Sequence, residues 1–433
     1  MNISRLVLRN FKGFEQFDQR LNKRFTLIVG KNGVGKSSIL DALSVAFGTF
    51  LLGIPNATSR HIQKGEVRET SRQFDDSLDF IAAYPAVVEA EGTLFDPLSG
   101  QSHSLVWKRE LNNPKGRTTV KDAREIRLLS DTAYAAAIDG LDPTLPLLSY
   151  YGTGRLWGEP KRIAQKERPS RFDAYRNSHE PRVSAGDLFD WLRRLRLSEF
   201  ETERSSPLLK AWRGAVESCF DDQVAVTYSP SRERVEVTFE SNDQTIAYEN
   251  LSHGQRNILS MIGDIAYKAI ILNPHLGAEA ISNARGIVLI DEIDLHLHPT
   301  WQRRIIPALL AAFPGLQFVA TTHSPFVIQS LNHGVMLDLD KRELDDRVHN
   351  LPIVDIIEDV QGVENQNRSE SYLHKMQGAE SYLRQVERMA ESENPAERAE
   401  LERRLDQMER DFQDPGLEAL MKIERQTRTK RGE

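Results

Sequence analysis

Hydrophobic and polar residues follow two rhythms within the first 55 residues. Residues 3–11 alternate between apolar and polar side chains, as a half-buried strand does. Residues 24–30 form a short apolar run that ends in Gly30 and is typical of a fully buried strand. From residue 36 to residue 52 the apolar positions recur at helical spacing. The pattern predicts two strands followed by a helix that ends before Pro55.

Strand and helix patterns alternate again between residues 251 and 340. The strand-like segments are short apolar runs, and most of the helix-like segments are longer and amphipathic. This alternation predicts a parallel sheet with helices on its faces. The predicted helices are 251–272, 299–313 and 326–331, and the predicted strands are 286–292, 317–323 and 334–340.

Residues 56–250 carry a mixed pattern. An apolar run at 145–151 leads into a glycine-rich loop and predicts a buried strand. Residues 161–182 carry many charges and two prolines, which indicates an exposed connection. The other segments predict a two-strand meander at 87–96 and 102–112, helices at 185–200 and 207–220, and a hairpin at 224–229 and 234–240.

The segment from about residue 366 onward is richer in charge and has apolar positions at helical spacing. Asn394, Pro395 and Glu397 occupy the positions of a helix N-cap, a first-turn proline and a capping-box acid. Asp414 and Pro415 repeat the cap. We predict two or three amphipathic helices here. They either pack on the body of the protein or offer a docking surface to a partner, and an amphipathic stripe fits both.

Composition narrows the class of protein. The 433 residues are 39% hydrophobic and 27% charged, with a formal net charge of −7. Passive coating of DNA is disfavoured, because counterion release needs clustered positive charge. One cysteine, Cys219, excludes a disulfide framework, and its amphipathic surroundings predict burial. We expect a cytoplasmic protein, because residues 1–14 lack the apolar core of a secretion signal and no apolar run of about 18 residues is evident.

Residues 30–37, GKNGVGKS, fit the phosphate-binding P-loop pattern GxxxxGK[ST]. The glycines let backbone N–H groups curl around a phosphate, and the start of the following helix adds a positive dipole end. We expect Lys36 to reach the β- and γ-phosphates of ATP and Ser37 to bind Mg²⁺. The other predicted nucleotide contacts are Gly30, Asn32, Gly33, Gly35 and Ser38.

Two further strand ends carry candidate catalytic side chains. Asp291 and Glu292 follow four apolar residues, and parallel sheets collect ligands at this end of their strands. Asp291 is expected to hold Mg²⁺ directly or through water, and Glu292 to orient and polarise the attacking water. His323 ends another predicted strand, where its imidazole could contact the γ-phosphate. The predicted catalytic residues are therefore Lys36, Glu292 and His323.

A second phosphate-facing feature begins at residue 251, in the sequence LSHGQ. A small hydroxyl and a glycine at the start of a helix form another anion site. One nucleotide does not need two such sites from one chain. We therefore predict that Ser252, His253, Gly254 and Gln255 serve the nucleotide held by another subunit.

Two other patterns do not indicate separate chemistry. His296 and His298 lie near Asp294, but no further ligand has suitable metal-site spacing. Asp338 and Asp340 form a DxD pattern, yet the roughly 90 residues that follow lack the strand–helix alternation of a nuclease domain. We expect neither a dedicated metal site nor nuclease chemistry from these residues.

Together, GKNGVGKS, LSHGQ, IVLIDE with IDLHLHP, and TTHSP resemble the ABC-type ATPase heads of SMC and RecF proteins. The chain is most similar to AAA-family ATPases of anti-phage defence, the PtuA proteins of Septu systems and the ATPases of retrons. The resemblance implies an α/β fold, with an ABC-type P-loop head whose mixed or parallel sheet is flanked by helices. The implied segments are 1–55 and 251–340 for the two parts of the head, 56–250 for an inserted α+β lobe, and 341–433 for a charged helical extension.

The resemblance also implies how the parts work. Two heads pair as a homodimer or higher oligomer, with ATP and Mg²⁺ between one P-loop and the LSHGQ segment of the partner. Asp294 would cross this interface. The sequence departs from the common pattern at His253, where many relatives have glycine, and it has no clear glutamine loop after residue 151. One interpretation is therefore a slow ATPase that acts as a nucleotide sensor.

The leading hypothesis is an ATPase whose head pairing regulates a separate effector in bacterial anti-phage defence. The effector is expected to be an HNH-type nuclease subunit, with nucleic acid reached through the complex and no membrane partner. Prolines scattered between the P-loop and LSHGQ exclude a long coiled-coil arm. Two alternatives stay open: a RecF-like ATPase of DNA repair or maintenance, and a nucleotide sensor scaffold that does not hydrolyse ATP.

Overall fold

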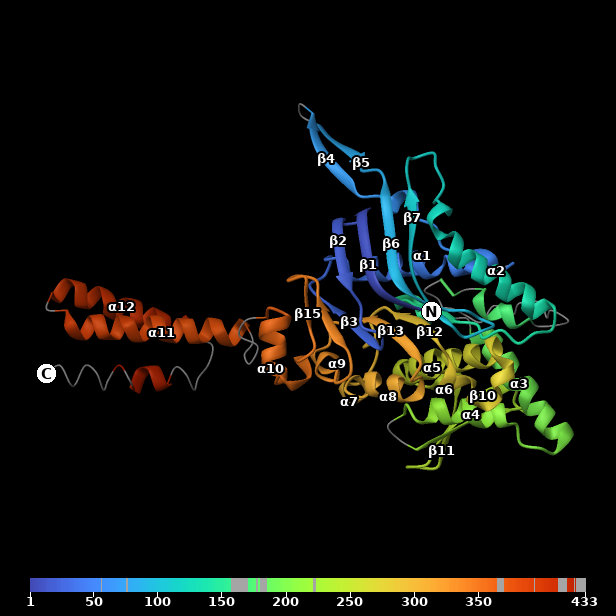
Figure 1. The fold of residues 1–433 in the computed structure, drawn as a ribbon. Coiled ribbons are helices and arrows are strands. Elements are labelled where there is room, and N and C mark those ends of the chain that lie inside the picture. The colour runs from blue at the N-terminus through green and yellow to red at the C-terminus, as the bar shows by residue number, and fades with distance from the viewer. Residues whose placement is uncertain are drawn as a thin grey trace. The chain divides into compact units, whose positions relative to one another are not determined.

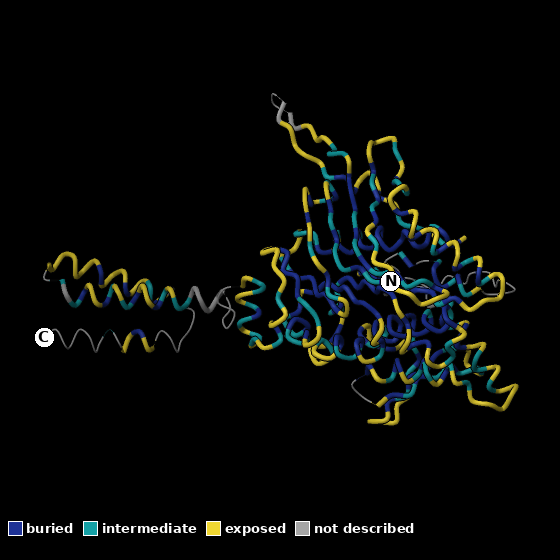
Figure 2. The backbone as a smooth tube through the Cα atoms, in the orientation of Figure 1, coloured by how far each residue is buried: buried dark blue, intermediate teal, exposed yellow. Residues whose placement is uncertain are grey.

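The chain folds into two compact units, Met1–Gln361 and Gly362–Glu433, in a computed structural model. The structure describes residues 1–55, 57–74, 77–156, 170–176, 178–179, 185–220, 223–363, 370–392, 394–411, 419–423 and 425. Buried residues of the first unit lie along its central strands and the helices that cover them (Figure 2).

A six-stranded sheet forms the centre of the first unit (Figure 1). Its order is β15-β14-β3-β13-β12-β8, and every neighbouring pair is parallel except β14 with β15. All residues of β3, β8, β12 and β13 are buried, as expected when helices cover both faces of a sheet. The strands are β3 (Phe25–Val29), β8 (Leu147–Tyr151), β12 (Gly286–Ile290), β13 (Leu316–Thr321), β14 (Val335–Asp338) and β15 (Glu343–Asp345).

The register of the central strands aligns their carboxyl ends. Ile28 of β3 lies beside Thr321 of β13, and Ala320 of β13 lies beside Ile290 of β12. The segments that follow these three strands therefore emerge at one edge of the sheet, where parallel sheets bind ligands. This edge receives the P-loop, the acidic pair and the histidine that the sequence singles out.

Helix α1 (Lys36–Phe47) contacts this sheet and also a four-stranded antiparallel sheet of order β2-β1-β6-β7. The segment Lys36–Gly53 is long and apolar enough to cross a membrane, but 78% of it is buried inside the unit, as in a core helix. The α-helix is shorter than predicted, because Gly48 disfavours helix and a 3₁₀ turn follows at Phe50–Gly53. The four strands are β1 (Asn2–Phe11), β2 (Phe14–Arg20), β6 (Ala86–Phe95) and β7 (Ser102–Leu111).

A group of helices and a small antiparallel sheet confirm the helices and hairpin predicted between residues 185 and 272. The Trp212 indole donates a 2.9 Å hydrogen bond to the carbonyl of Gly263, which joins α4 to α5. The long helix α5 also packs against β8 of the central sheet. The elements are α3 (Ala185–Thr202), α4 (Pro207–Glu217), β9 (Val224–Ser229), β10 (Arg234–Phe239), β11 (Gln244–Ala247) and α5 (His253–Leu272).

Two further sequence predictions differ from the structure, and several elements were not among those predicted. The single helix predicted at 299–313 is two helices, because Pro307 has no N–H to bond the carbonyl of Arg303. The predicted exposed connection at 161–182 lies largely outside the described residues, and its described part buries Phe172 and Tyr175. The unpredicted elements include a helix and a hairpin. The elements concerned are α7 (Pro299–Gln302), α8 (Ile305–Ala312), α2 (Arg124–Ile138), β4 (Glu69–Phe74) and β5 (Ser77–Ala82).

Short helices complete the first unit, and two long helices define the second. The short ones are α6 (Ala280–Asn283), α9 (Pro325–Gln329) and α10 (Ile353–Asp355). The long ones, α11 (Glu370–Glu391) and α12 (Pro395–Asp411), confirm the amphipathic prediction, and α12 begins at the predicted proline. The second predicted cap, at Asp414 and Pro415, lies outside the described residues. The second unit has its own apolar cluster of Tyr382, Val386, Met389, Leu401, Leu405 and Met421.

Candidate nucleotide-binding and hydrolysis site

The P-loop lies between the end of β3 and the start of α1. Gly35 caps α1 in a left-handed conformation, with φ of 106°. A Cβ at this position would lie 2.7 Å from the ring of Phe14 in β2. Gly30 and Gly33 also have positive φ, at 144° and 83°. The backbone path therefore depends on glycine, and it presents the start of a 12-residue helix as an anion site.

Lys36 is held at the mouth of this loop. Its Nζ donates to the carbonyls of Gly30 and Lys31, at 2.8 and 3.0 Å. Burial lowers the pKa of Lys36, and the negative charges around it oppose that shift. The opposing carboxylates belong to Asp291, Asp340, Glu292 and Asp294. The ammonium thus sits among acidic groups at the strand ends, where phosphates can replace the two carbonyls.

The exposed part of the loop suits a phosphate and a hard cation. Asn32, Gly33 and Ser37 are exposed, and Ser38 is half-buried. The Ser37 hydroxyl and the Asp291 carboxylate supply oxygen, the ligand type that Mg²⁺ prefers. A Cβ at Gly30 would lie 2.9 Å from Val34, so the cradle has room only for backbone at that point.

The acidic pair is organised by a threonine that sequence reasoning missed. Asp291 is only 7% exposed, and one carboxylate oxygen accepts a 2.6 Å hydrogen bond from the Thr321 hydroxyl. The same hydroxyl accepts the N–H of Glu292 at 2.8 Å. Glu292 has a left-handed backbone with φ of 48°, an uncommon conformation for a residue other than glycine. Thr321 therefore fixes both the side chain of Asp291 and the backbone turn that carries Glu292.

A second missed residue is Asp340, which follows β14. Its carboxylate accepts the N–H of Lys31 at 2.9 Å. Because β14 pairs in parallel with β3, the residues after the two strands come together. The aspartates of the DxD pattern thus have structural roles: Asp340 buttresses the P-loop, and buried Asp338 accepts the N–H of Asp340 at 3.0 Å.

The LSHGQ segment caps α5. The Ser252 hydroxyl accepts the N–H of Gln255 at 3.3 Å, and the Gln255 side chain accepts the N–H of Ser252 at 3.0 Å. Ser252 and His253 are exposed, whereas Gly254 is buried. A Cβ on Gly254 would lie 2.6 Å from the carbonyl of His296, and the His253 and His296 rings are 5.3 Å apart. This segment therefore packs on the loop after β12 of its own chain and leaves the helix start open.

The loop after β12 also holds Asp294, and the neighbouring strand end holds His323. Asp294 is half-buried and accepts a hydrogen bond from the Thr322 hydroxyl. His323 is exposed, and its carbonyl accepts the Gln361 side chain at 2.7 Å. Since β13 lies between β3 and β12, His323 emerges at the same sheet edge as the P-loop and the acidic pair.

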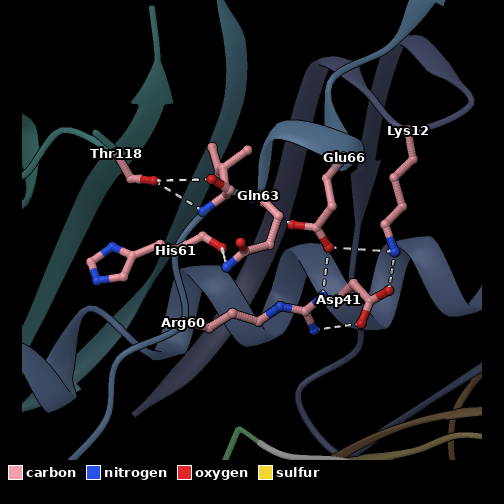
Figure 3. Close-up of polar contacts among 8 residues, drawn as sticks. Lys12, Asp41, Arg60, His61, Gln63, Glu66 and Thr118 are labelled. Atoms are coloured by element: carbon pink, nitrogen blue, oxygen red, sulfur yellow. Dashed lines mark hydrogen bonds and ion pairs between the residues drawn. The ribbon is translucent and has the colours of Figure 1, made fainter. Parts of the chain in front are cut away.

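A charged network anchors the P-loop helix from behind (Figure 3). Asp41, one turn after Ser37 on α1, pairs with both Lys12 and Arg60. Glu66 pairs with the same two cations, at 3.5 and 2.6 Å. The four side chains are between 8% and 27% exposed. Lys12 begins the turn between β1 and β2, so the network joins α1 to the strand pair that carries Phe14, the neighbour of Gly35.

Residues 25–329 match the protein family described as "AAA domain, putative AbiEii toxin, Type IV TA system". The chain belongs to this AAA family. The matched region contains the P-loop, the acidic pair, LSHGQ and His323, whereas Lys12 and Asp340, which support the P-loop, lie outside it. The AAA protein is an ATPase, as the sequence motifs predict, and its central sheet has the predicted α/β architecture.

Relatives of the AAA protein agree with the predicted resemblance. The chain is 26% identical over 397 residues to the retron Vc95 probable ATPase of Vibrio cholerae serotype O1 biovar El Tor, covering 76% of this chain and 74% of the relative. It is 27% identical over 339 residues to the Septu protein PtuA of Bacillus mycoides (strain KBAB4), covering 78% of this chain and 40% of the relative. A solved SMC head bound to the C-winged helix domain of ScpA is 17% identical, with a TM-score of 0.46, covering 78% of this chain and 94% of that chain.

Proposed function

We propose that this ATPase is a nucleotide-driven switch in bacterial anti-phage defence. ATP binding pairs two heads, and pairing regulates a separate nuclease subunit. The observation that carries the proposal is the presence of two helix starts suited to phosphate. The P-loop supplies a full cradle for one nucleotide, and the exposed Ser252 and His253 present a second helix start. The retron and Septu relatives support the defence role.

The first half of the site holds the nucleotide of its own chain. When ATP binds, Lys36 leaves the carbonyls of Gly30 and Lys31 and donates to the β- and γ-phosphates. Phosphate oxygens are the better acceptors because they are negatively charged and carbonyl oxygens are neutral. Ser37 and Asp291 would hold Mg²⁺, which would neutralise phosphate charge. Glu292 orients and polarises the attacking water, and His323 contacts the γ-phosphate. Thr321 keeps the acidic pair in position for this work.

The second half of the site comes from the partner head. The capping box between Ser252 and Gln255 holds the start of α5 in shape, which leaves the exposed side of the helix start available to the partner's γ-phosphate. Asp294 approaches the partner from the neighbouring loop. Hydrolysis then removes the phosphate that joins the heads, so the reaction limits the lifetime of the paired state.

The nuclease activity is assigned to another subunit. Within the described residues, Asp338 and Asp340 are engaged in supporting the P-loop and the turn after β14. The amphipathic helices of the second unit are the proposed docking surface for that subunit. Nucleic acid is then contacted through the complex, in keeping with the net charge of −7.

Glu292→Gln tests the pairing. This variant keeps the shape of the side chain but removes its charge, so we expect ATP to bind and not to be hydrolysed. Addition of ATP should then convert the protein to a dimer or higher oligomer in analytical ultracentrifugation. The same variant carrying Ser252→Arg should bind ATP and stay unpaired, because the arginine blocks the second helix start. A Glu292→Gln protein whose mass does not change with saturating ATP would refute head pairing.

The regulation of an effector is tested separately. The ATPase and the nuclease subunit encoded beside it are purified together, and cleavage of DNA or RNA is compared between wild type, Lys36→Ala and Glu292→Gln. We expect the two variants to shift cleavage in opposite directions, since one cannot bind ATP and the other cannot release it. Equal cleavage in all three complexes would show that ATP does not regulate the effector.

A further inference from the structure

Arg155 lies in the glycine-rich loop after β8, where a glutamine loop is absent from the sequence. Its side chain is 4% exposed, although arginine is seldom buried to this degree. Three of its hydrogen bonds go to backbone carbonyls: Gly152 at 3.0 Å, Asp291 at 2.7 Å and Glu292 at 2.8 Å. The guanidinium thus donates hydrogen bonds to the backbone carbonyls of both members of the acidic pair.

The fourth hydrogen bond of Arg155 reaches a different element. Its Nε donates to the side-chain oxygen of Asn257 at 2.6 Å, and Asn257 lies in the second turn of α5. The amide nitrogen of Asn257 in turn donates to the carbonyl of Leu295 at 2.9 Å. A continuous chain of hydrogen bonds therefore links the helix that carries LSHGQ, the turn that carries Glu292, and the loop that carries Asp294.

The electrostatic setting of Arg155 fits a positioning role. Burial lowers its pKa to about 10, against the opposing effect of Asp291, Asp294 and Glu292, so the side chain stays charged at neutral pH. Its nitrogens are engaged with carbonyls and an amide. The planar guanidinium fork can satisfy these acceptors together, whereas a lysine ammonium, a single point charge, cannot.

A second contact between the same elements provides an internal comparison. The Tyr151 hydroxyl donates to Asp264 at 2.7 Å, and Asp264 also pairs with Lys268 at 2.8 Å. Asp264 is seven residues after Asn257 and therefore lies on the same face of α5. This contact also joins α5 to β8, but among the described residues its side chains make no hydrogen bond to the carbonyls of Asp291 and Glu292.

We propose that Arg155 is a positioning residue for ATP hydrolysis, which fixes the Asp291–Glu292 turn and couples it through Asn257 to the start of α5. The inference rests on the proposed head pairing, because the partner's nucleotide would act on the start of α5. A shift of that helix start then reaches the turn that aims Glu292 at the attacking water. Arg155 acts through the backbone of the acidic pair and not by contact with the nucleotide.

The test compares Arg155→Lys, Asn257→Ala and the matched control Tyr151→Phe in the full-length protein. For the first two we expect kcat to fall by about tenfold to a hundredfold, because small misplacements of catalytic groups have effects of this size. ATP affinity, measured with a fluorescent ATP analogue, should stay near that of wild type. Tyr151→Phe should keep kcat, although it also removes a buried hydrogen bond to α5. The double variant of Arg155 and Asn257 should lose less than the product of the single losses.

Several outcomes would overturn the inference. One is a kcat for Arg155→Lys and Asn257→Ala no lower than that of Tyr151→Phe. Another is an equal loss of ATP affinity and kcat, which would indicate general damage to the site. If Arg155→Lys does not fold, as judged by its thermal transition, Asn257→Ala decides alone. Pairing in a Glu292→Gln background is measured in parallel. Absence of pairing there refutes the proposed function, whereas pairing with an undiminished kcat in Asn257→Ala refutes this inference only.

Discussion

The Thr321 hydroxyl donates a 2.6 Å hydrogen bond to the carboxylate of Asp291, although 30 positions separate the two residues in the sequence. Thr321 ends β13 and Asp291 follows β12, so the parallel pairing of the two strands creates the contact. The hydroxyl also accepts the N–H of Glu292 at 2.8 Å. One threonine therefore holds both the predicted metal ligand, Asp291, and the residue predicted to polarise the attacking water, Glu292.

Replacement of Thr321 by valine should separate shape from hydrogen bonding. Valine has nearly the same volume but lacks the hydroxyl, so Asp291 loses a donor and the N–H of Glu292 loses its acceptor. We expect the Mg²⁺-dependent ATPase rate to fall by about tenfold to a hundredfold, the range for residues that orient a metal ligand. Thr321→Ser keeps the hydroxyl and should retain most of the rate. Equal rates for the valine and serine variants would contradict this role.

Gly35 should tolerate no side chain. The backbone at Gly35 is left-handed, with φ of 106°, a conformation that residues with a side chain rarely adopt. A Cβ there would also lie 2.7 Å from the Phe14 ring. We expect Gly35→Ala to lose ATP binding in a fluorescence titration, with a conformational cost of about 1–3 kcal/mol. Gly33→Ala is the matched control, since φ is 83° there but a Cβ meets no atom within 4 Å. If both variants bind ATP equally weakly, backbone strain alone accounts for the loss and the Phe14 contact does not matter.

Asp41 should contribute to stability more than to chemistry. It neutralises both Lys12 and Arg60 behind the P-loop helix, with its side chain 14% exposed. Asp41→Asn removes the charge at constant shape and should cost about 1–3 kcal/mol of unfolding free energy, because the cations keep only one carboxylate. Chemical denaturation monitored by tryptophan fluorescence measures this cost. Asp18→Asn is the control, because Asp18 pairs with Arg5 on the surface at 53% exposure. A larger loss at Asp18 would contradict the argument.

The central strands and the P-loop were predictable because their signals are local. The apolar runs that became β3, β12 and β13 are buried at every residue, and a fully buried strand shows this in its own sequence. The P-loop glycines are likewise a local signal, because each stands at a position whose backbone has a positive φ. Helix α12 was found for the same reason, since its cap and its first-turn proline are adjacent in the chain.

The unpredicted features depend on contacts between distant segments. The acceptors of Arg155 include Asn257, Asp291 and Glu292, which are 102 to 137 positions away. Asp340 reaches the P-loop only because β14 pairs with β3. Helix α2 buries Ile126 with alanines and a serine, while Leu128 and Ile138 are exposed, so its large apolar residues do not mark the buried face.

Cys219 should report local opening of the first unit. Burial raises the pKa of its thiol to about 11 and leaves the residue 9% exposed. A disulfide reagent that attacks thiolates should therefore react slowly with the native protein at pH 8 and rapidly in denaturant. The folded state disfavours the thiolate, so this group's contribution to stability is present below the unfolded pKa of 9.0 and is lost as pH rises toward 11. Rapid labelling of the native protein at pH 8 would contradict the burial.

The second unit can be disrupted to test whether ATP hydrolysis by the first unit depends on its helices. Leu405 is fully buried in a small cluster that has six buried members among the described residues, so Leu405→Ala should cost about 2–5 kcal/mol and unfold this unit. We expect lower helicity by circular dichroism, faster proteolysis after residue 362, and an unchanged rate of ATP hydrolysis. Leu420→Ala is the control, since Leu420 is 65% exposed.

The same pair of variants addresses the proposed docking role. In the purified complex with the nuclease subunit, Leu405→Ala should release that subunit during size-exclusion chromatography while ATP hydrolysis continues. Leu420→Ala keeps the cluster intact and should therefore keep the fold of the unit. A nuclease subunit that stays bound to the Leu405→Ala protein would show that the first unit makes the contact. Loss of ATP hydrolysis in the same variant would instead show that the apolar cluster of the second unit supports the head itself.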